Sequence, residues 1–312
     1  MILVTGGTGF IGKALIRSLV ESGYPVRTLI RPSSQSPDLP RGVGVEVAVS
    51  SLKDERGLRA AMVGVDTVYH LAGVERRGAY ASLMEVDIQG TQAVTTAAVD
   101  AGVDRLFYLS HLGADRASAF PVLKSKAIAE EHIRRSGIDY TIMRTAIIFG
   151  PGDGFTTGLA RLITPIPFLF LTPGDGSTLV QPLWIEDLVT CLTWALDDDG
   201  TRNELYEVGG PEYFTFKQVV ELVIEVIGIR RRIVPVRPPI LRGITVILDT
   251  IFPGLPVSVY WLDYLAANRT CALDTIPRNF HLMPSRMSQR IDYLRGEKWG
   301  RSLFSTLVKR RV

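Results

Sequence analysis

Short apolar runs alternate with helix-like stretches through the first half of the chain. Runs of four or five apolar residues predict buried strands, and apolar residues at a spacing of three and four predict the helices between them. The predicted strands are Ile2–Thr5, Val26–Ile30, Val45–Val49, Thr67–Leu71, Leu106–Ser110 and Tyr140–Arg144. The predicted helices are Lys13–Ser22, Glu55–Met62, Glu85–Ala101 and Leu123–Ser136. This alternation predicts an α/β protein, a Rossmann doubly wound parallel sheet with helices on both faces.

The pattern loosens after residue 150, where prolines interrupt an apolar stretch, Leu159–Leu171, that is a candidate wall for a substrate pocket. Farther along, the pattern predicts a helix at Trp184–Leu196, a strand at Leu205–Val208 and an amphipathic helix at Phe216–Ile227. We therefore expect residues 1–150 to form the nucleotide-binding domain, with 178–210 returning to it. Residues 151–177 and 211–312 are expected to form a smaller, mostly helical C-terminal subdomain.

The loop Thr5–Gly12 lies between the first strand and the first helix. Gly6 and Gly9 permit a tight turn and the approach of backbone to a pyrophosphate, and Gly12 permits close packing of helix on strand. Free N–H groups at the start of the helix then bind the phosphates. Because the glycines occupy this position in a βαβ unit, they predict binding of NADP(H) or NAD(H).

The end of the second strand bears on the choice between these cofactors. An NAD-binding site commonly has an acidic residue there, which accepts a hydrogen bond from the ribose 2′-hydroxyl. This chain instead has Leu29-Ile30-Arg31-Pro32-Ser33-Ser34. Since Arg31 is able to pair with a 2′-phosphate, NADP(H) is preferred, with NAD(H) as the alternative. In that alternative Arg31 is simply a solvated loop cation.

The small net charge of +3 conceals an uneven distribution. Residues 230–312 hold 15 Lys and Arg against 5 Asp and Glu, whereas the rest of the chain is acidic. Apolar runs such as Ile244–Leu248 lie in the same basic region. This combination suggests a membrane surface or a membrane-associated protein complex as a partner through residues 230–312. The competing interpretation is a helical subdomain with a solvated basic face, and no motif predicts a specific nucleic-acid partner.

The remaining features restrict location and chemistry. The two cysteines, Cys191 and Cys271, are too few for a disulfide framework, and the start of the chain lacks the pattern of a secretory signal. We expect a cytoplasmic protein that contacts at most the inner face of a membrane, since no window is apolar enough to span one. The four histidines are scattered, so no metal site is predicted.

Several motifs together resemble the extended and atypical short-chain dehydrogenase/reductase superfamily, the NAD(P)-dependent epimerase/dehydratase-like proteins. They are Val4-Thr-Gly-Gly-Thr-Gly-Phe-Ile-Gly12, His70-Leu-Ala-Gly73, Lys126-Ala-Ile-Ala-Glu130, Arg144-Thr-Ala-Ile-Ile-Phe-Gly-Pro-Gly-Asp153, Gln181-Pro-Leu-Trp-Ile-Glu-Asp187 and Gly209-Gly-Pro211. Within the superfamily, the chain is most similar to the group that contains the NADPH-binding accessory subunit of respiratory complex I and its bacterial relatives. The C-terminal segment, including Val234-Pro-Val-Arg-Pro-Pro, extends this similarity more loosely.

The resemblance assigns roles around the cofactor. It implies that the pyrophosphate is held by Gly6, Thr8, Gly9, Phe10, Ile11 and Gly12. It places Arg31 at the adenosine ribose and Ser51 with Leu52 beside the adenine. It also places Leu71, Ala72 and Gly73 along the ribose path, and Lys126 at the nicotinamide ribose.

The catalytic pattern of the superfamily is only partly present. Its enzymes pair a tyrosine with a lysine four residues later, and the lysine lowers the pKa of the phenol. Here Lys126 is kept, but Val122 occupies the tyrosine position. Ser110 matches the usual serine or threonine and is a candidate to hydrogen-bond a substrate carbonyl, or else a buried serine satisfied by backbone. His111 and Lys124 are weaker candidates to replace the phenol.

Two functions remain open from the sequence. The first is a cofactor-binding structural, assembly or sensing protein at a membrane-associated complex, with little or no turnover. The second is an oxidoreductase or epimerase-like enzyme for a lipid, quinone, steroid or nucleotide-sugar type of substrate, with Ser110, Lys126 and a non-standard acid. A nucleic-acid-linked regulator has less support, because an excess of basic charge is non-specific.

Overall fold

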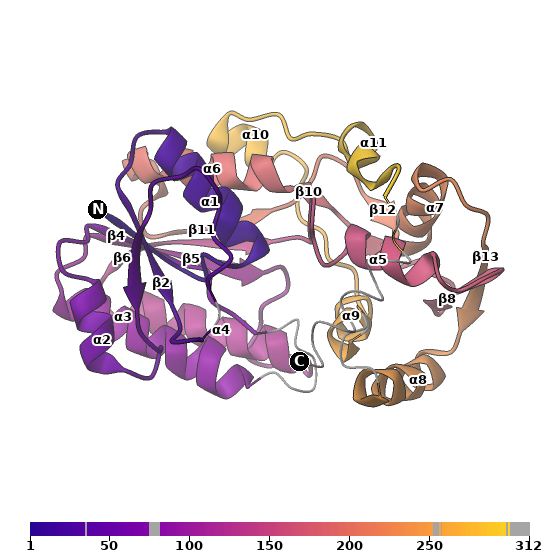
Figure 1. The fold of residues 1–312 in the computed structure, drawn as a ribbon, viewed down its shortest axis with the longest axis horizontal. Helices are drawn as coiled ribbons and strands as arrows, with labels where there is room; N and C mark the ends of the chain where they lie inside the picture. The colour runs from indigo at the N-terminus through magenta and orange to yellow at the C-terminus, as the bar shows by residue number, and fades with distance from the viewer. Residues whose placement is uncertain (35, 75–81, 252–255, 257, 298, 300–312) are drawn as a thin grey trace.

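A parallel sheet of seven strands forms the larger part of the molecule (Figure 1). The computed structural model describes residues 1–34, 36–74, 82–251, 256, 258–297 and 299. The sheet has the order β11-β6-β5-β4-β1-β2-β3. Its strands are β1 (Ile2–Thr5), β2 (Val26–Ile30), β3 (Glu46–Val49), β4 (Thr67–His70), β5 (Arg105–His111), β6 (Asp139–Thr145) and β11 (Glu204–Val208). From β3 to β6 this is the order of a Rossmann sheet, extended by β11 at the β6 edge.

Helices cover both faces of the sheet, as the alternating pattern predicts (Figure 1). On one face lie α1 (Phe10–Glu21) and α6 (Ile185–Asp197), and on the other lie α2 (Glu55–Ala61), α3 (Thr91–Asp100) and α4 (Pro121–Arg135). Successive strand residues point to opposite faces, so Ile2 and Val4 pack under α1 and α6 while Leu3 packs under α2 and α3. The Rossmann prediction is confirmed.

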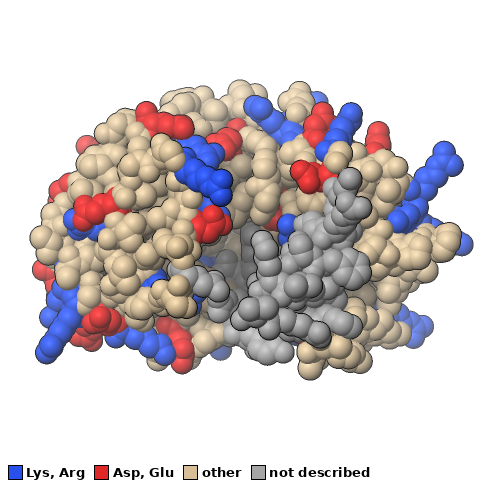
Figure 2. Space-filling view, in the orientation of Figure 1, with Lys and Arg blue, Asp and Glu red and all other residues tan. Residues whose placement is uncertain are grey.

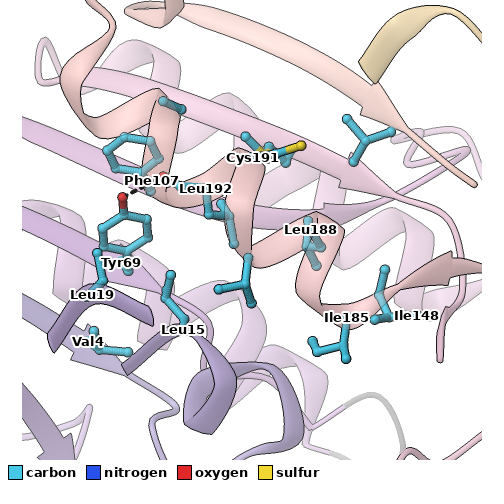
Figure 3. Packing of buried hydrophobic residues seen from close by; sticks show 14 of the residues in the cluster. Val4, Leu15, Leu19, Tyr69, Phe107, Ile148, Ile185, Leu188, Cys191 and Leu192 are labelled. Atoms are coloured by element: carbon cyan, nitrogen blue, oxygen red, sulfur yellow. Dashed lines mark hydrogen bonds between the residues drawn. The ribbon is translucent and has the colours of Figure 1, made fainter. Parts of the chain in front are cut away.

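Aromatic stacking ties the first face together (Figure 3). The rings of Tyr69 and Phe107 stack with their centroids 4.4 Å apart. The Tyr69 hydroxyl donates a hydrogen bond of 2.8 Å to the carbonyl of Leu192 on α6, so this buried phenol is satisfied. The packing fixes α6, and with it residues far along the chain, on the sheet.

The segment predicted as one helix at Glu85–Ala101 has two parts. Residues Met84–Gly90 form a π-helix, and α3 follows directly from Thr91. The wider turn brings Asp87 inside the fold, where it is fully buried. Single turns of π-helix occur frequently at functional sites, and this one lies beside the predicted Lys126.

Most of the described residues after β6 that do not pack on the large sheet form a smaller part around a second apolar core. Its helices are α5 (Thr156–Ile163), α7 (Phe216–Val226), α8 (Pro238–Ile251), α9 (Val259–Tyr264) and α11 (Met287–Arg290), with the 3-10 turn Ile291–Leu294. Short strand pairs accompany them: β7 (Ile148–Phe149) with β10 (Leu183–Trp184), β9 (Leu179–Val180) with β12 (Phe214–Thr215), and β8 (Leu169–Pro173) with β13 (Arg232–Val236).

Two features qualify the predicted division of the chain. The apolar stretch Leu159–Leu171 is split between α5 and β8, because Pro165 and Pro167 interrupt the helix. From the C-terminal region, α10 (Thr275–Phe280) returns to pack on the core beneath α6. The domain boundaries predicted from the sequence stay a prediction.

Within the part of the chain that the structure describes, no helix combines the length and the apolar character needed to cross a bilayer.

Candidate functional site

The loop between β1 and α1 has the geometry that close approach of a ligand requires. Gly6 has a φ of +76°, and a Cβ there would lie 2.7 Å from the carbonyl carbon of Leu71. A Cβ on Gly12 would lie 2.3 Å from the carbonyl oxygen of Gly6. The loop closes through a 2.9 Å hydrogen bond from the N–H of Gly9 to that same oxygen. Gly9 then begins α1 without any side-chain cap, which leaves the N-terminus of the helix open to an anion.

A cavity of about 280 Å³ extends from this loop across the carboxyl ends of β4 and β5. Ligands bind to open α/β sheets at this edge. The lining residues are Gly6, Gly9, Phe10, Ile11, Gly12, Leu71, Gly73, Val74, Leu109, Ser110, His111, Lys126, Thr145, Ala146, Ile147, Ile148, Tyr260, Trp261 and Tyr264. The cavity therefore joins the glycine loop to both predicted catalytic residues, Ser110 and Lys126.

Ser110 lies near the end of β5 and is 1% exposed. Its Oγ is buried and has no hydrogen-bond partner among the described residues. The alternative interpretation, a serine satisfied by backbone, therefore does not describe this side chain. A buried hydroxyl without a partner is costly, and a ligand in the cavity would satisfy it.

Lys126 on α4 forms a buried ion pair that the sequence did not predict. Its Nζ lies 3.1 Å from Oδ1 of Asp87, with the two side chains 5% and 0% exposed. The second carboxylate oxygen of Asp87 accepts a 3.3 Å hydrogen bond from the N–H of Val74. Lys126 also lies over the ring of Tyr108, 5.4 Å from its centroid. These contacts hold the ammonium group at the wall of the cavity.

His70 ends β4 next to this ion pair but is occupied by structure. Its Nε2 lies 3.0 Å from the Thr91 hydroxyl, whose proton goes to the carbonyl of Asp87. Nε2 is therefore the donor, and Nδ1 accepts from the Thr5 hydroxyl at 2.7 Å. Burial, together with the charge of Lys126, lowers the pKa of His70 to about 3, so the ring is neutral.

Val122, at the predicted tyrosine position, and the two weaker candidates for proton transfer, Lys124 and His111, lie in different surroundings. Val122 packs against the second apolar core and does not line the cavity. Lys124 is exposed on the same helix and does not line the cavity either. His111 does line the cavity, with its ring 6.2 Å from that of Tyr260.

Helix α9 supplies aromatic residues that sequence reasoning missed. Tyr260, Trp261 and Tyr264 line the cavity from the C-terminal part of the molecule. The Tyr264 hydroxyl is buried beside the backbone of Ile147, and burial raises its pKa well above the usual value. The guanidinium of Arg269, itself buried, lies 5.7 Å from the centre of the Tyr264 ring. The spacing of four between the two tyrosines was the available signal, because it places them on one helical face.

The other predicted cofactor residues lie outside the cavity. Thr8 and Arg31 are exposed, and Ser51, Leu52 and Ala72 are half-buried. Arg31 directly follows β2, and Ser51 with Leu52 follows β3, at the same edge of the sheet as the glycine loop. Their roles toward the adenosine half of a dinucleotide stay predictions.

Comparison with known proteins bears on what occupies this site. A family model described as NAD(P)H-binding matches residues 6–159. A relative from Methylococcus capsulatus, sterol demethylase protein B, is 30% identical over 279 residues, which cover 79% of this chain and 80% of the relative. The chain belongs to the extended short-chain dehydrogenase/reductase superfamily.

Other relatives agree with this assignment. The mitochondrial subunit 9 of the NADH dehydrogenase (ubiquinone) 1 alpha subcomplex from Arabidopsis thaliana is 29% identical, over 86% of this chain and 70% of the relative. The structure of a Citrobacter sp. triphenylmethane reductase complexed with NADP(H) has the same fold, with a TM-score of 0.74 at 20% identity, covering 94% of this chain and 98% of that one. This chain is an NAD(P)(H)-binding member of the superfamily with relatives among complex I subunits.

Proposed function

We propose that this chain holds NADP(H) and acts as a structural, assembly or sensing component at a membrane-associated complex, with little or no turnover. Val122 is the observation that carries this proposal. The superfamily's proton donor is replaced by a side chain that cannot transfer a proton and that packs into an apolar core. Loss of a positioned acid or base typically lowers a rate by about 10²–10⁴.

The preference for NADP(H) over NAD(H) is supported by Arg31. The side chain is exposed directly after β2, and it forms no ion pair with any residue in the described ranges. A 2′-phosphate would give it a charge-assisted partner. Arg31→Ala should lower the affinity for NADPH at least tenfold and change the affinity for NADH less than twofold. Equal effects on the two affinities would contradict this role.

The membrane side of the proposal is supported by α8. Ile240, Ile244, Ile247 and Ile251 are 37–59% exposed and follow one another at helical spacing, which gives an apolar stripe. Arg230, Arg232 and Arg237 are exposed just before it. Figure 2 shows basic side chains along the right-hand edge of the molecule, beside a largely uncharged surface. An apolar stripe flanked by arginines fits an anionic bilayer surface at the inner, cytoplasmic face of a membrane.

Turnover is the decisive test of the proposed role. The protein is purified without added cofactor, and any bound dinucleotide is identified by mass spectrometry. The NADPH-loaded protein is then incubated with aldehydes, ketones and quinones while the reduced-nicotinamide absorbance is followed. We expect bound NADP(H) and no oxidation beyond one equivalent; multiple turnovers with any of these compounds would overturn the proposal.

A second candidate function, carbonyl reduction, is favoured by the unpartnered hydroxyl of Ser110 and by the phenol of Tyr264, both at the wall of the cavity. Ser110 would hold the substrate oxygen, and Tyr264, which its raised pKa keeps protonated, would donate a proton to it. The carbonyl carbon would take a hydride from the reduced nicotinamide, so one NADPH is consumed for each alcohol formed. Lys126 would bind the nicotinamide ribose. In this case Tyr264→Phe and Lys126→Ala should each abolish the activity, and an activity that survives both changes would exclude this mechanism.

A further inference from the structure

A second cavity, larger and almost entirely apolar, lies on the other side of α9. Its volume of about 480 Å³ falls within the range of about 300–1,000 Å³ that small-molecule sites occupy. It is lined mainly by α5, β8, α8 and the start of α9. Its lining includes Phe155, Leu159, Phe170, Leu241, Leu248 and Leu262, and no charged side chain from the described residues takes part.

Helix α9 divides the two cavities. Tyr260 and Tyr264 face the dinucleotide cavity, whereas Leu262 and Leu265 face the apolar one. Trp261 lines both, so a ligand in the apolar cavity would contact the same indole that borders the dinucleotide site. Figure 1 shows α9 between the sheet domain and α8.

The apolar cavity contains one polar group that lacks a partner. Ser258 is the residue before α9, a position where a serine side chain usually accepts a hydrogen bond from the helix backbone. Here it makes no such bond. Its Oγ is buried, lines the cavity and has no partner within the described part of the chain. An oxygen atom of a ligand would satisfy this hydroxyl, as it would that of Ser110.

We propose that the cavity between α5, α8 and α9 binds a neutral lipid with one hydrocarbon tail and a hydroxyl or carbonyl oxygen that hydrogen-bonds to Ser258. The tail is selected by the apolar walls, and a charged head is rejected because the described lining offers it no counter-ion. Ile244 of α8 both lines the cavity and is 37% exposed, so the cavity lies directly beside the surface of the molecule. This site is distinct from dinucleotide binding and stands whether or not hydride is transferred.

Straight-chain 2-alkanones, from 2-hexanone to 2-dodecanone, are suitable probes for calorimetry on the full chain. Each added methylene should tighten binding about fourfold until the cavity is full. Decanoate, which carries a charge, should bind at least tenfold more weakly than 2-decanone. If no alkanone binds, or if decanoate binds as well as 2-decanone, the proposal is wrong.

Variants at Gly158 and Ser258 locate the binding. Gly158 lies on α5 at the cavity wall, where a Cβ would make an ordinary contact of 3.6 Å with Pro256. The larger side chain of Gly158→Leu should fill the cavity and lower the affinity for 2-decanone at least tenfold. The matched control Gly158→Ala should bind 2-decanone normally. Ser258→Ala should weaken 2-decanone about fivefold and keep the dependence on chain length.

Binding of NADPH, measured on the same samples, shows whether each variant is folded and tests the dinucleotide site separately. The lipid proposal is overturned if Gly158→Leu still binds 2-decanone like the unmodified chain. If the unmodified chain binds 2-decanone but not NADPH, the result counts against the proposed function alone.

Discussion

At the scale of single residues, His70 makes the stability of the fold depend on pH. Its pKa is about 3 in the folded chain and 6.5 when exposed, so unfolding is accompanied by proton uptake below pH 6.5. The stabilisation is therefore complete above pH 6.5 and is lost as the pH falls toward 3. Between pH 7 and pH 5 we expect a loss of about 2 kcal/mol in the free energy of unfolding, measured with urea. In His70→Asn the free energy of unfolding should lack this contribution to its pH dependence. If the pH dependence is the same as in the unmodified chain, the ring is not buried in its neutral form.

The ion pair of Lys126 and Asp87 makes a second prediction at this scale. Lys126→Met removes the cation from a carboxylate that is fully buried, so we expect a loss of about 3 kcal/mol in unfolding free energy. The double variant Lys126→Met with Asp87→Leu removes both charges and should be more stable than the single variant. Urea unfolding without dinucleotide measures both. Simple additivity of the two changes would mean that the pair does not couple.

At the scale of elements, the start of α1 determines whether a dinucleotide binds. In Gly12→Ala the new Cβ would meet the carbonyl oxygen of Gly6 at 2.3 Å, so the loop must move from under the phosphates. Such overpacking costs about 1–3 kcal/mol, and we expect NADPH affinity to fall at least tenfold by calorimetry. Gly44→Ala is the matched control, because a Cβ there meets no atom within 4 Å. Normal binding by Gly12→Ala would contradict the assignment of this loop.

The same scale shows what the sequence could predict. The strands and the glycine loop are local patterns, so β1 and β2 lie at the predicted residues. The π-turn at Asp87 and the contribution of α9 to the site are not local. Asp87 is turned inward to meet Lys126, and Tyr264 lines the same cavity as Gly6 because the C-terminal part packs on the sheet domain. Pairing of distant segments depends on tertiary packing, which no periodicity within either segment reports.

For the whole molecule, the apolar cavity and the apolar stripe of α8 place both proposed lipid contacts on one helix. α8 lines the apolar cavity with Leu241, Thr245 and Leu248, and it exposes Ile240, Ile247 and Ile251. A molecule that takes a lipid tail from a bilayer needs a helix in contact with that bilayer. The proposed membrane contact and the proposed lipid site therefore depend on the same element.

Binding to vesicles tests the membrane contact. The chain should sediment with vesicles of phosphatidylglycerol and much less with phosphatidylcholine, because each arginine near an anionic surface contributes about 1 kcal/mol.

Ile240→Glu with Ile247→Glu changes two side chains that are 56% and 59% exposed, so the fold should persist while vesicle binding falls at least tenfold. Val63→Glu, at a side chain 70% exposed beyond α2, is the matched control and should bind normally. Binding should also weaken at high salt, since exposed charges are screened. Equal binding by the double variant and the control would show that α8 does not contact the membrane. Equal binding to both lipids would show that the arginines do not contribute to binding.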